Sequence, residues 1–266
     1  MHFNPTPINI LVSIIAALLG GAQNSVAGGG SFLLFPTLLA IGMPPVIANT
    51  TNTAALWPGS IASVFGYRDE VKQVWKTQKG AFALVIVSLV GGLIGAALLL
   101  GTSSSVFSGL LPWLLLIATL LFAFGNRLSA AARVRSEHLK LPDWSITAII
   151  WGMQLVTAIY GGYFGAGIGI VMLAVLTIWG MKNIHEMNGI KTLLATSING
   201  VAVVYFVARG TVDFPSVLWM IAGAIIGGYF GARLGRLVNP IRMRQFITVV
   251  AILLTIYFFA HTYLNV

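Results

Sequence analysis

Long apolar runs with almost no charge constrain this chain more than any other feature of its sequence. Two examples are residues 81–100 and 106–124, each long enough as a helix to cross a bilayer core of about 30 Å. Charged residues make up 8% of the 266 residues, against roughly 25% in a soluble domain. A soluble globule could not hide that much apolar surface. We therefore expect an all-α, polytopic integral membrane protein with about 8 to 10 transmembrane segments.

The composition also excludes several classes of function. The chain has no cysteine, which rules out disulfides, thiolate metal sites and cysteine nucleophiles. Its net charge of +9 would suggest nucleic-acid binding in a soluble protein, but basic residues of a membrane protein report topology first. No P-loop, HExxH or GxSxG motif occurs. The sequence therefore predicts no enzyme, no metal site, no cofactor and no nucleic-acid partner.

Matching segments in the two halves of the chain indicate an internal repeat. Residues 91–98 and 227–234 both read Gly-Gly-x-x-Gly-Ala-x-Leu, and an Asn-x-x-x-Thr pattern begins at both Asn49 and Asn188. These matches occur in the same order at a near-constant offset, which is the signature of a repeat. The predicted organisation is a first transmembrane repeat over 1–126, a basic cytoplasmic linker over 127–143 and a second transmembrane repeat over 144–266.

The basic residues predict that the two repeats are inverted. If each repeat crosses the membrane five times, the basic loops at 68–79, 127–140 and 233–244 fall on one side, as the positive-inside rule requires. If each repeat instead crosses four times, with its short segment re-entrant, the 233–244 loop falls opposite the other two. Both topologies stay open here, and the rule favours the first.

Two apolar segments are unusually short. Residues 31–42 and 168–180 follow clustered glycines and end at helix-breaking turns. As helices they would reach only about 20 Å, which is less than the bilayer core. Discontinuous helices of this kind are typical of transporters with inverted repeats, where their N-terminal ends point at anionic groups of the substrate.

Polar residues inside the apolar runs mark the candidate site. Such residues are costly in lipid and normally face a cavity or a partner. The predicted substrate-binding residues are Asn49, Thr50, Asn52, Thr53, Asn188, Lys191, Thr192, Gln23 and Asn24. Asn199 shares the helical face of Asn188 and Lys191.

Each of these residues also has a structural interpretation. Lys191 could supply positive charge to an anion, or its long side chain could snorkel to the membrane surface. Asn49 and Asn52 could bind substrate or provide hydrogen bonds between helices. Gln23 and Asn24 precede the first glycine cluster and could line the same cavity.

The order of glycines, prolines and polar residues gives the chain a family resemblance. In the first half it includes Gly28-Gly29-Gly30-Ser31, Pro36, Gly42, Pro44 and Ala48-Asn49-Thr50-Thr51-Asn52, and in the second half Gly165, Gly167, Lys191-Thr192 and Gly210-x-Val212-Asp213. This pattern resembles the sulfite exporter TauE/SafE family. The resemblance implies an integral membrane permease for small organic or inorganic sulfur anions, driven by an ion gradient.

We therefore expect a secondary transporter that moves sulfite, sulfoacetate or another organosulfonate across the bacterial inner membrane by alternating access. An anion channel, or a transporter of a small carboxylate, on the same scaffold is the alternative. The expected partners are the small anion, the lipid bilayer, a coupling proton or sodium ion and a second copy of the chain in a homodimer. No acidic residue lies well inside an apolar run, so a carboxylate-based ion site is not expected.

Overall fold

The computed structural model describes residues 6–26, 28–78, 80–138, 143–234 and 240–263, and its regular structure there is entirely helical. In chain order the helices are α1 (Pro7–Val26), α2 (Ser31–Ala40), α3 (Pro45–Gly66), α4 (Arg68–Thr77), α5 (Ala81–Gly101), α6 (Ser104–His138), α7 (Asp143–Tyr163), α8 (Ile168–Ile178), α9 (Ile184–Ala208), α10 (Phe214–Leu234) and α11 (Pro240–Tyr263). Six of them, namely α1, α5, α7, α9, α10 and the first part of α6, are long and apolar enough to cross a membrane. The predicted all-α membrane class is confirmed.

The outer surface of these helices is apolar. Phe82 of α5, Val156 of α7 and Leu218 of α10 are each about two-thirds exposed. A soluble protein would rarely leave so many large apolar side chains uncovered. In a bilayer they face lipid, so the same side chains that exclude a soluble fold make the membrane fold favourable.

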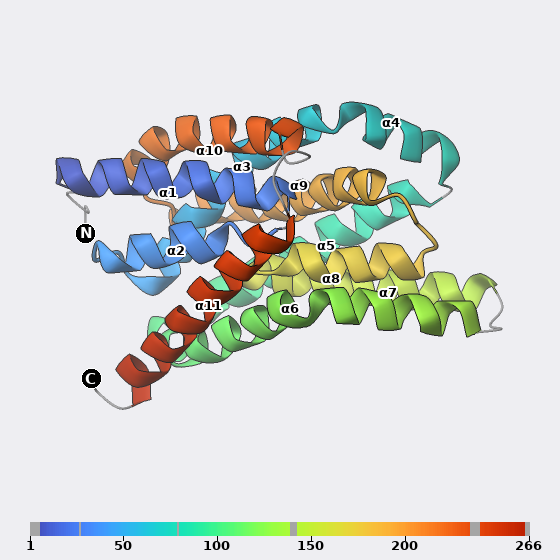
Figure 1. Cartoon of the computed structure of the whole chain (residues 1–266). Coiled ribbons are helices and arrows are strands. Elements are labelled where there is room, and N and C mark those ends of the chain that lie inside the picture. The colour runs from blue at the N-terminus through green and yellow to red at the C-terminus, as the bar shows by residue number, and fades with distance from the viewer. Residues whose placement is uncertain (1–5, 27, 79, 139–142, 235–239, 264–266) are drawn as a thin grey trace.

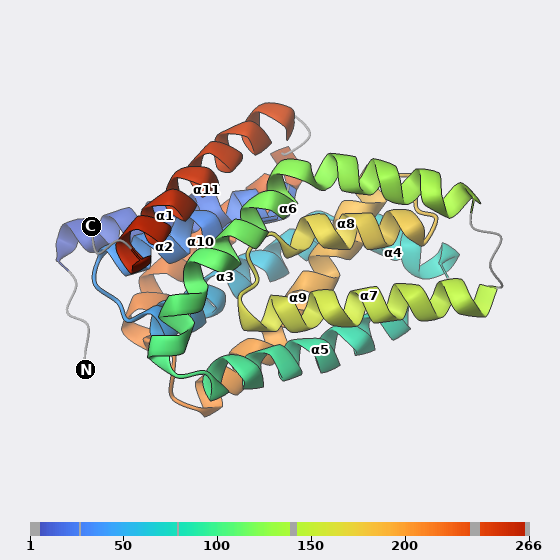
Figure 2. The same ribbon diagram turned by 90° about the horizontal axis from the view of Figure 1, so that it is seen from below.

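Most helices lie roughly along one direction in a single bundle (Figure 1 and Figure 2). The beginning of α1 and the end of α11 lie toward one end of the molecule, and α4 lies toward the other. The short helix α2 packs beside α1 and runs back toward the end where α1 begins, whereas α8 packs beside α7 and runs back toward the opposite end (Figure 1). Each short helix thus forms a hairpin with the helix before it.

The two short helices end in the same way. Gly42 follows α2 with a φ of 95°, and Gly180 follows α8 with a φ of 90°. After α2, the Gly42 N–H donates to the carbonyl of Leu39 and the Met43 N–H donates to that of Leu38. This is a Schellman cap, which requires a left-handed residue and therefore favours glycine. The prediction of two short helices followed by helix-breaking turns is confirmed.

A polar side chain on the preceding helix also donates a hydrogen bond to a backbone carbonyl within each break. The Gln23 Nε2 atom of α1 donates to the Gly28 carbonyl at 3.0 Å, and the Tyr160 hydroxyl of α7 donates to the Ala166 carbonyl at 3.0 Å. These bonds satisfy carbonyls that a continuous helix would have paired internally. Each break is therefore held in place by a side-chain hydrogen bond from the helix before it, in both halves of the chain.

The repeated Gly-Gly-x-x-Gly-Ala-x-Leu segments lie where helices approach most closely. A Cβ atom on Gly227 of α10 would overlap the Leu18 carbonyl oxygen of α1. A Cβ atom on Gly91 of α5 would lie 2.9 Å from the Leu155 carbonyl oxygen of α7. Small residues allow such backbone-to-backbone packing in membranes. These helix pairs join the two halves, because α1 of the first packs on α10 of the second and α5 of the first packs on α7 of the second.

Helix α4 lies where the sequence predicted only a basic loop. Its residues Val71 and Val74 are buried, and they are one helical turn apart. Asp69 lies in its first turn and Lys76 in its last, which suits the helix dipole. Helix α6 likewise continues to His138, so part of the predicted linker is helical.

Candidate functional site

Two helix breaks, one from each half of the chain, meet inside the bundle. Gly28, between α1 and α2, has a φ of 75°, and Gly167, between α7 and α8, has a φ of 79°. A Cβ atom on Gly28 would lie 3.1 Å from the Cα atom of Gly169 at the start of α8. Residues without side chains thus bring the two breaks into contact, although they are far apart in sequence.

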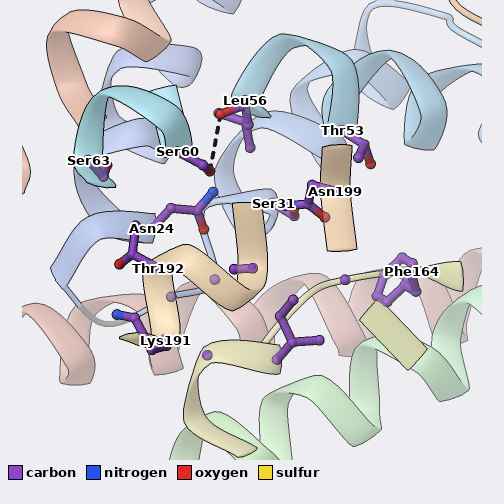
Figure 3. A pocket seen from close by; sticks show the side chains of 16 residues that line it. Asn24, Ser31, Thr53, Leu56, Ser60, Ser63, Phe164, Lys191, Thr192 and Asn199 are labelled. Atoms are coloured by element: carbon purple, nitrogen blue, oxygen red, sulfur yellow. Dashed lines mark hydrogen bonds between the residues drawn. The ribbon is translucent and has the colours of Figure 1, made fainter. Parts of the chain in front are cut away.

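A small polar cavity lies at this meeting point. Its volume is about 30 Å³, which is room for one or two water molecules. The polar side chains that line it are Asn24, Ser31, Thr53, Ser60, Ser63, Lys191, Thr192 and Asn199 (Figure 3). The other residues of the wall are Gly28, Gly29, Leu56, Phe164, Gly165, Ile168, Gly169 and Ala195. Both hairpins and the long helices α3 and α9 therefore meet at this polar space.

Lys191 is the one charged residue among those that line the cavity. Its side chain is only 1% exposed, so it does not snorkel to the surface. Its Nζ atom donates to the Ser25 carbonyl at 3.3 Å, and no carboxylate of the described residues lies within 4.0 Å of that nitrogen. An unpaired cation in a low-dielectric interior costs several kcal/mol, and a bound anion would offset this cost.

The other predicted residues on the wall differ in whether their polar atoms already have hydrogen-bond partners. The hydroxyl of Thr192 is buried and has no hydrogen-bond partner within the described part of the chain. The Thr53 hydroxyl donates to the Asn49 carbonyl at 2.9 Å, and the Asn24 Oδ1 atom accepts the Gly30 N–H at 2.7 Å. A buried polar atom that lacks a partner calls for an explanation, and at Thr192 a ligand in the cavity would supply one.

The remaining predicted residues, Gln23, Asn49, Thr50, Asn52 and Asn188, do not line this cavity. The Asn49 Nδ2 atom donates to the carbonyl of Tyr163 at 3.0 Å, and the Thr50 hydroxyl donates to the carbonyl of Thr211. In this structure Asn49 therefore joins α3 to the end of α7, and Thr50 joins α3 to the segment between α9 and α10.

Asn52 lies one contact away from the cavity. Its Nδ2 atom donates at 3.0 Å to the hydroxyl of Ser31, which is itself on the wall. The Oδ1 atoms of Asn52 and Asn188 are buried without a partner among the described residues. Asn52 thus positions a wall residue, while Asn188 lies on α9 outside the wall.

Three serines of the wall, Ser31, Ser60 and Ser63, are not among the residues predicted from the sequence. Ser60 and Ser63 follow Thr53 on α3 at spacings of seven and ten residues, which places all three on one helical face. That spacing was the available signal, but isolated serines are common in apolar helices because they bond to their own backbone. Both do so here: the Ser60 hydroxyl donates to the Leu56 carbonyl at 3.4 Å (Figure 3), and the Ser63 hydroxyl to the Gly59 carbonyl.

Comparison with known proteins agrees with the predicted family. Residues 13–258 match the family model described as "Sulfite exporter TauE/SafE". The "Probable membrane transporter protein YfcA" of Escherichia coli (strain K12) is 31% identical over 234 residues, which cover 87% of this chain and 82% of that protein. A "Probable membrane transporter protein" of Haemophilus influenzae is 26% identical over 239 residues, covering 87% of each chain. No solved structure matches the chain significantly.

The family match spans nearly the whole chain and includes both helix breaks, the cavity and Lys191. The relatives are membrane transporters by name, and the fold described above has helices that can span a bilayer. The chain is accordingly a transporter and not an enzyme. It belongs to the TauE/SafE family of membrane transporters.

Proposed function

We propose that this transporter moves a small sulfur oxyanion, such as sulfite, sulfoacetate or another organosulfonate, across the bacterial inner membrane. The observation that carries the proposal is Lys191, a buried cation on the wall of a cavity with no carboxylate of the described residues beside it. The description of the matching family, which names sulfite export, supports sulfur as the central atom of the anion.

The cavity wall offers a suitable set of groups for an oxyanion. Lys191 supplies the charge, and the unpartnered hydroxyl of Thr192 can donate a hydrogen bond. The first residues of α2 and α8, Ser31 and Ile168, also line the cavity, so the N-terminal ends of both short helices are close to it. The dipole at the N-terminal end of a helix favours an anion. Several N–H groups of these first turns, such as those of Phe32 and Ile170, already donate to carbonyls of the glycine breaks, so the support here comes from the dipoles.

Alternating access is the mechanism that best fits the architecture. The cavity, at about 30 Å³, is too small for an anion larger than one or two water molecules, so the helices around it must move for transport. Two inverted repeats would supply that motion. In support, the α1–α2 hairpin opens toward one end of the molecule and the α7–α8 hairpin toward the other (Figure 1). If α7 corresponds to α1 and α10 to α5, the contacts α1–α10 and α5–α7 are also equivalent to each other.

Cysteine labelling tests the inverted topology. Ser104 begins α6 and Gln245 lies near the start of α11, and both are exposed. Because the chain has no cysteine, Ser104→Cys and Gln245→Cys each introduce a unique thiol. We expect a membrane-impermeant thiol reagent to label the first from outside intact cells and the second only after the membrane is opened. Labelling of both from the same side would contradict the inverted repeat.

A thermal-shift panel on detergent-purified protein tests the substrate class. We expect sulfite or an organosulfonate to raise Tm selectively, because a ligand that binds only the folded state adds RT ln(1 + [L]/Kd) to its stability, about 2.7 kcal/mol at a hundredfold excess over Kd. Acetate, sulfate and chloride serve as controls at equal ionic strength. Stabilisation by acetate but by no sulfur anion would instead favour a small carboxylate as substrate.

Flux through proteoliposomes then separates a carrier from an anion channel on the same scaffold. A carrier gives saturable counterflow of the stabilising anion, whereas a channel gives currents that rise with voltage. Imposed proton and sodium gradients, applied one at a time, identify the coupling ion. The mass of the protein in mild detergent tests the proposed homodimer.

A further inference from the structure

A second cavity, larger than the first and open on the surface, lies at the end of the bundle where α5 and α9 end and α3 and α6 begin. Its volume is about 570 Å³, far more than the central cavity offers. Its wall includes Val46, Thr102, Ser104, Tyr205, Arg209 and Thr211. A space of this size admits a hydrated anion without any movement of the helices.

Arg209 is the one charged residue among those that line this cavity, and it is exposed at the cavity mouth. It caps the C-terminal end of α9. Its guanidinium group lies over the ring of Tyr205, 5.1 Å from the ring centroid, and its Nη2 atom donates to the Tyr205 hydroxyl at 3.2 Å. Stacking of this kind orients the planar group and leaves its other N–H donors available.

No carboxylate of the described residues lies within 4.0 Å of the Arg209 guanidinium. The nearest carboxylate in sequence, Asp213, accepts the backbone N–H of Ser216 at 3.2 Å and thus caps α10. The positive charge of Arg209 is therefore not neutralised by an ion pair within the described part of the chain. A guanidinium group with free donors binds oxyanions in a two-point geometry.

The large cavity and the central one lie along the same pair of helices. On α3, Val46 lines the large cavity and Thr53, two turns later, lines the central one. On α9, Tyr205 of the large cavity follows Asn199 of the central one by under two turns. The two cavities therefore lie at successive levels of the same two helices.

Tyr163 and Phe164 connect the two cavities. The Tyr163 hydroxyl donates to the Thr102 hydroxyl at 3.3 Å, and Thr102 lines the large cavity. The next residue, Phe164, lines the central cavity and packs edge-on against Phe35 with ring centroids 5.6 Å apart. Two consecutive residues at the end of α7 thus contact the two spaces, Tyr163 through Thr102 and Phe164 directly.

We infer that the large cavity is an anion-binding vestibule, in which Arg209 holds a small oxyanion on the transport path before or after its passage through the central site. The ligand class is a small sulfonate or a similar oxyanion with two oxygens free for the guanidinium group. This site lies outside the central cavity that carries the proposed function, and its test does not depend on transport.

The experiment reports the electrostatic potential of the vestibule through the reactivity of a thiol. Ser104→Cys places a unique thiol on its wall, and its rates of modification by an anionic sulfonatoethyl and a cationic trimethylammonium-ethyl thiosulfonate are compared. We expect the Arg209→Gln variant to lower the anion-to-cation rate ratio about fourfold at low salt, as for one unit charge about 10 Å from the thiol. The Arg209→Lys variant should keep most of the ratio, because it keeps the charge.

Binding is tested on the same thiol with sulfoacetate, which does not react with it. We expect millimolar sulfoacetate to slow the modification of Ser104→Cys, and this protection to be lost when Arg209 is replaced by glutamine. Lys182→Gln, which removes an equal charge from an exposed residue just before α9, is the matched control and should leave both results unchanged. The vestibule is overturned by any of three results. These are a rate ratio that is the same in Arg209→Gln, a thiol that sulfoacetate still protects in that variant, and an equal effect of Lys182→Gln. If these tests succeed but no sulfur anion raises Tm in the thermal-shift panel, the proposed function is wrong and the vestibule stands.

Discussion

Replacing Lys191 with methionine is expected to weaken anion binding strongly and to slow transport while leaving the protein folded. The variant keeps most of the side-chain volume and removes the only charge on the cavity wall. Truncating one partner of a buried charged pair costs about 2 to 5 kcal/mol or more in binding, so affinity should fall by at least about thirtyfold. Tm of the ligand-free protein should stay the same or rise, because a buried, unpaired cation opposes folding.

The measurement is anion-induced thermal shift and counterflow for Lys191→Met, beside two comparison variants. Lys182→Met makes the same chemical change at an exposed position and should bind and transport normally. Lys191→Arg keeps the charge but has a larger, planar head, and we expect it to bind weakly and to transport slowly. A lower Tm together with normal transport by Lys191→Met would show that Lys191 is structural and would remove the main support for the central site.

Replacing Gly227 with alanine is expected to cause one of the largest losses of stability among the glycine-to-alanine changes at described positions. The new Cβ atom would overlap the Leu18 carbonyl oxygen and would lie 3.0 Å from the Ala22 nitrogen. Both are backbone atoms, so no side chain can rotate away, and α1 and α10 must separate. Overpacking of this kind typically costs 1 to 3 kcal/mol, and occasionally more.

The matched control is Gly109→Ala, on α6, where the added methyl group meets no atom within 4 Å. Alanine favours a helix by about 1 kcal/mol over glycine, so this variant should be neutral or more stable. Gly91→Ala, at the equivalent crossing of α5 and α7, should be destabilised in the same direction as Gly227→Ala. Thermal unfolding of the detergent-purified proteins measures all three, and equal Tm values for Gly227→Ala and Gly109→Ala would refute the close approach of α1 and α10.

The sequence predicted the helical membrane class and the two short helices because both depend on local properties. A run of about 20 apolar residues satisfies its backbone only as a helix in lipid. Clustered glycines and a glycine such as Gly42 end a helix wherever it lies in the fold. Helix α4 was missed because its ten residues carry few apolar side chains, and the burial of Val74 depends on helices distant in sequence.

The candidate site was predicted only in part. Asn24, Thr53, Lys191 and Thr192 line the central cavity, whereas Asn49 and Thr50 bond to the ends of distant segments. All of them are polar residues in an apolar setting. The free energy of placing a polar residue in lipid therefore does not distinguish a residue that binds a ligand from one that forms a hydrogen bond between helices. What separates them is which carbonyl or hydroxyl lies opposite each side chain.

By itself, the sequence determined that this chain spans a membrane, that two of its helices are short and broken, and that Lys191 is an expensive residue to bury. These properties follow from composition and from turns of a few residues. Only the tertiary structure decided that Gly28 meets Gly169, that both breaks open on one cavity, and that Arg209 stands alone among uncharged residues in another. The physical reason is that a cavity exists only between helices, so its walls depend on contacts between residues far apart in the chain.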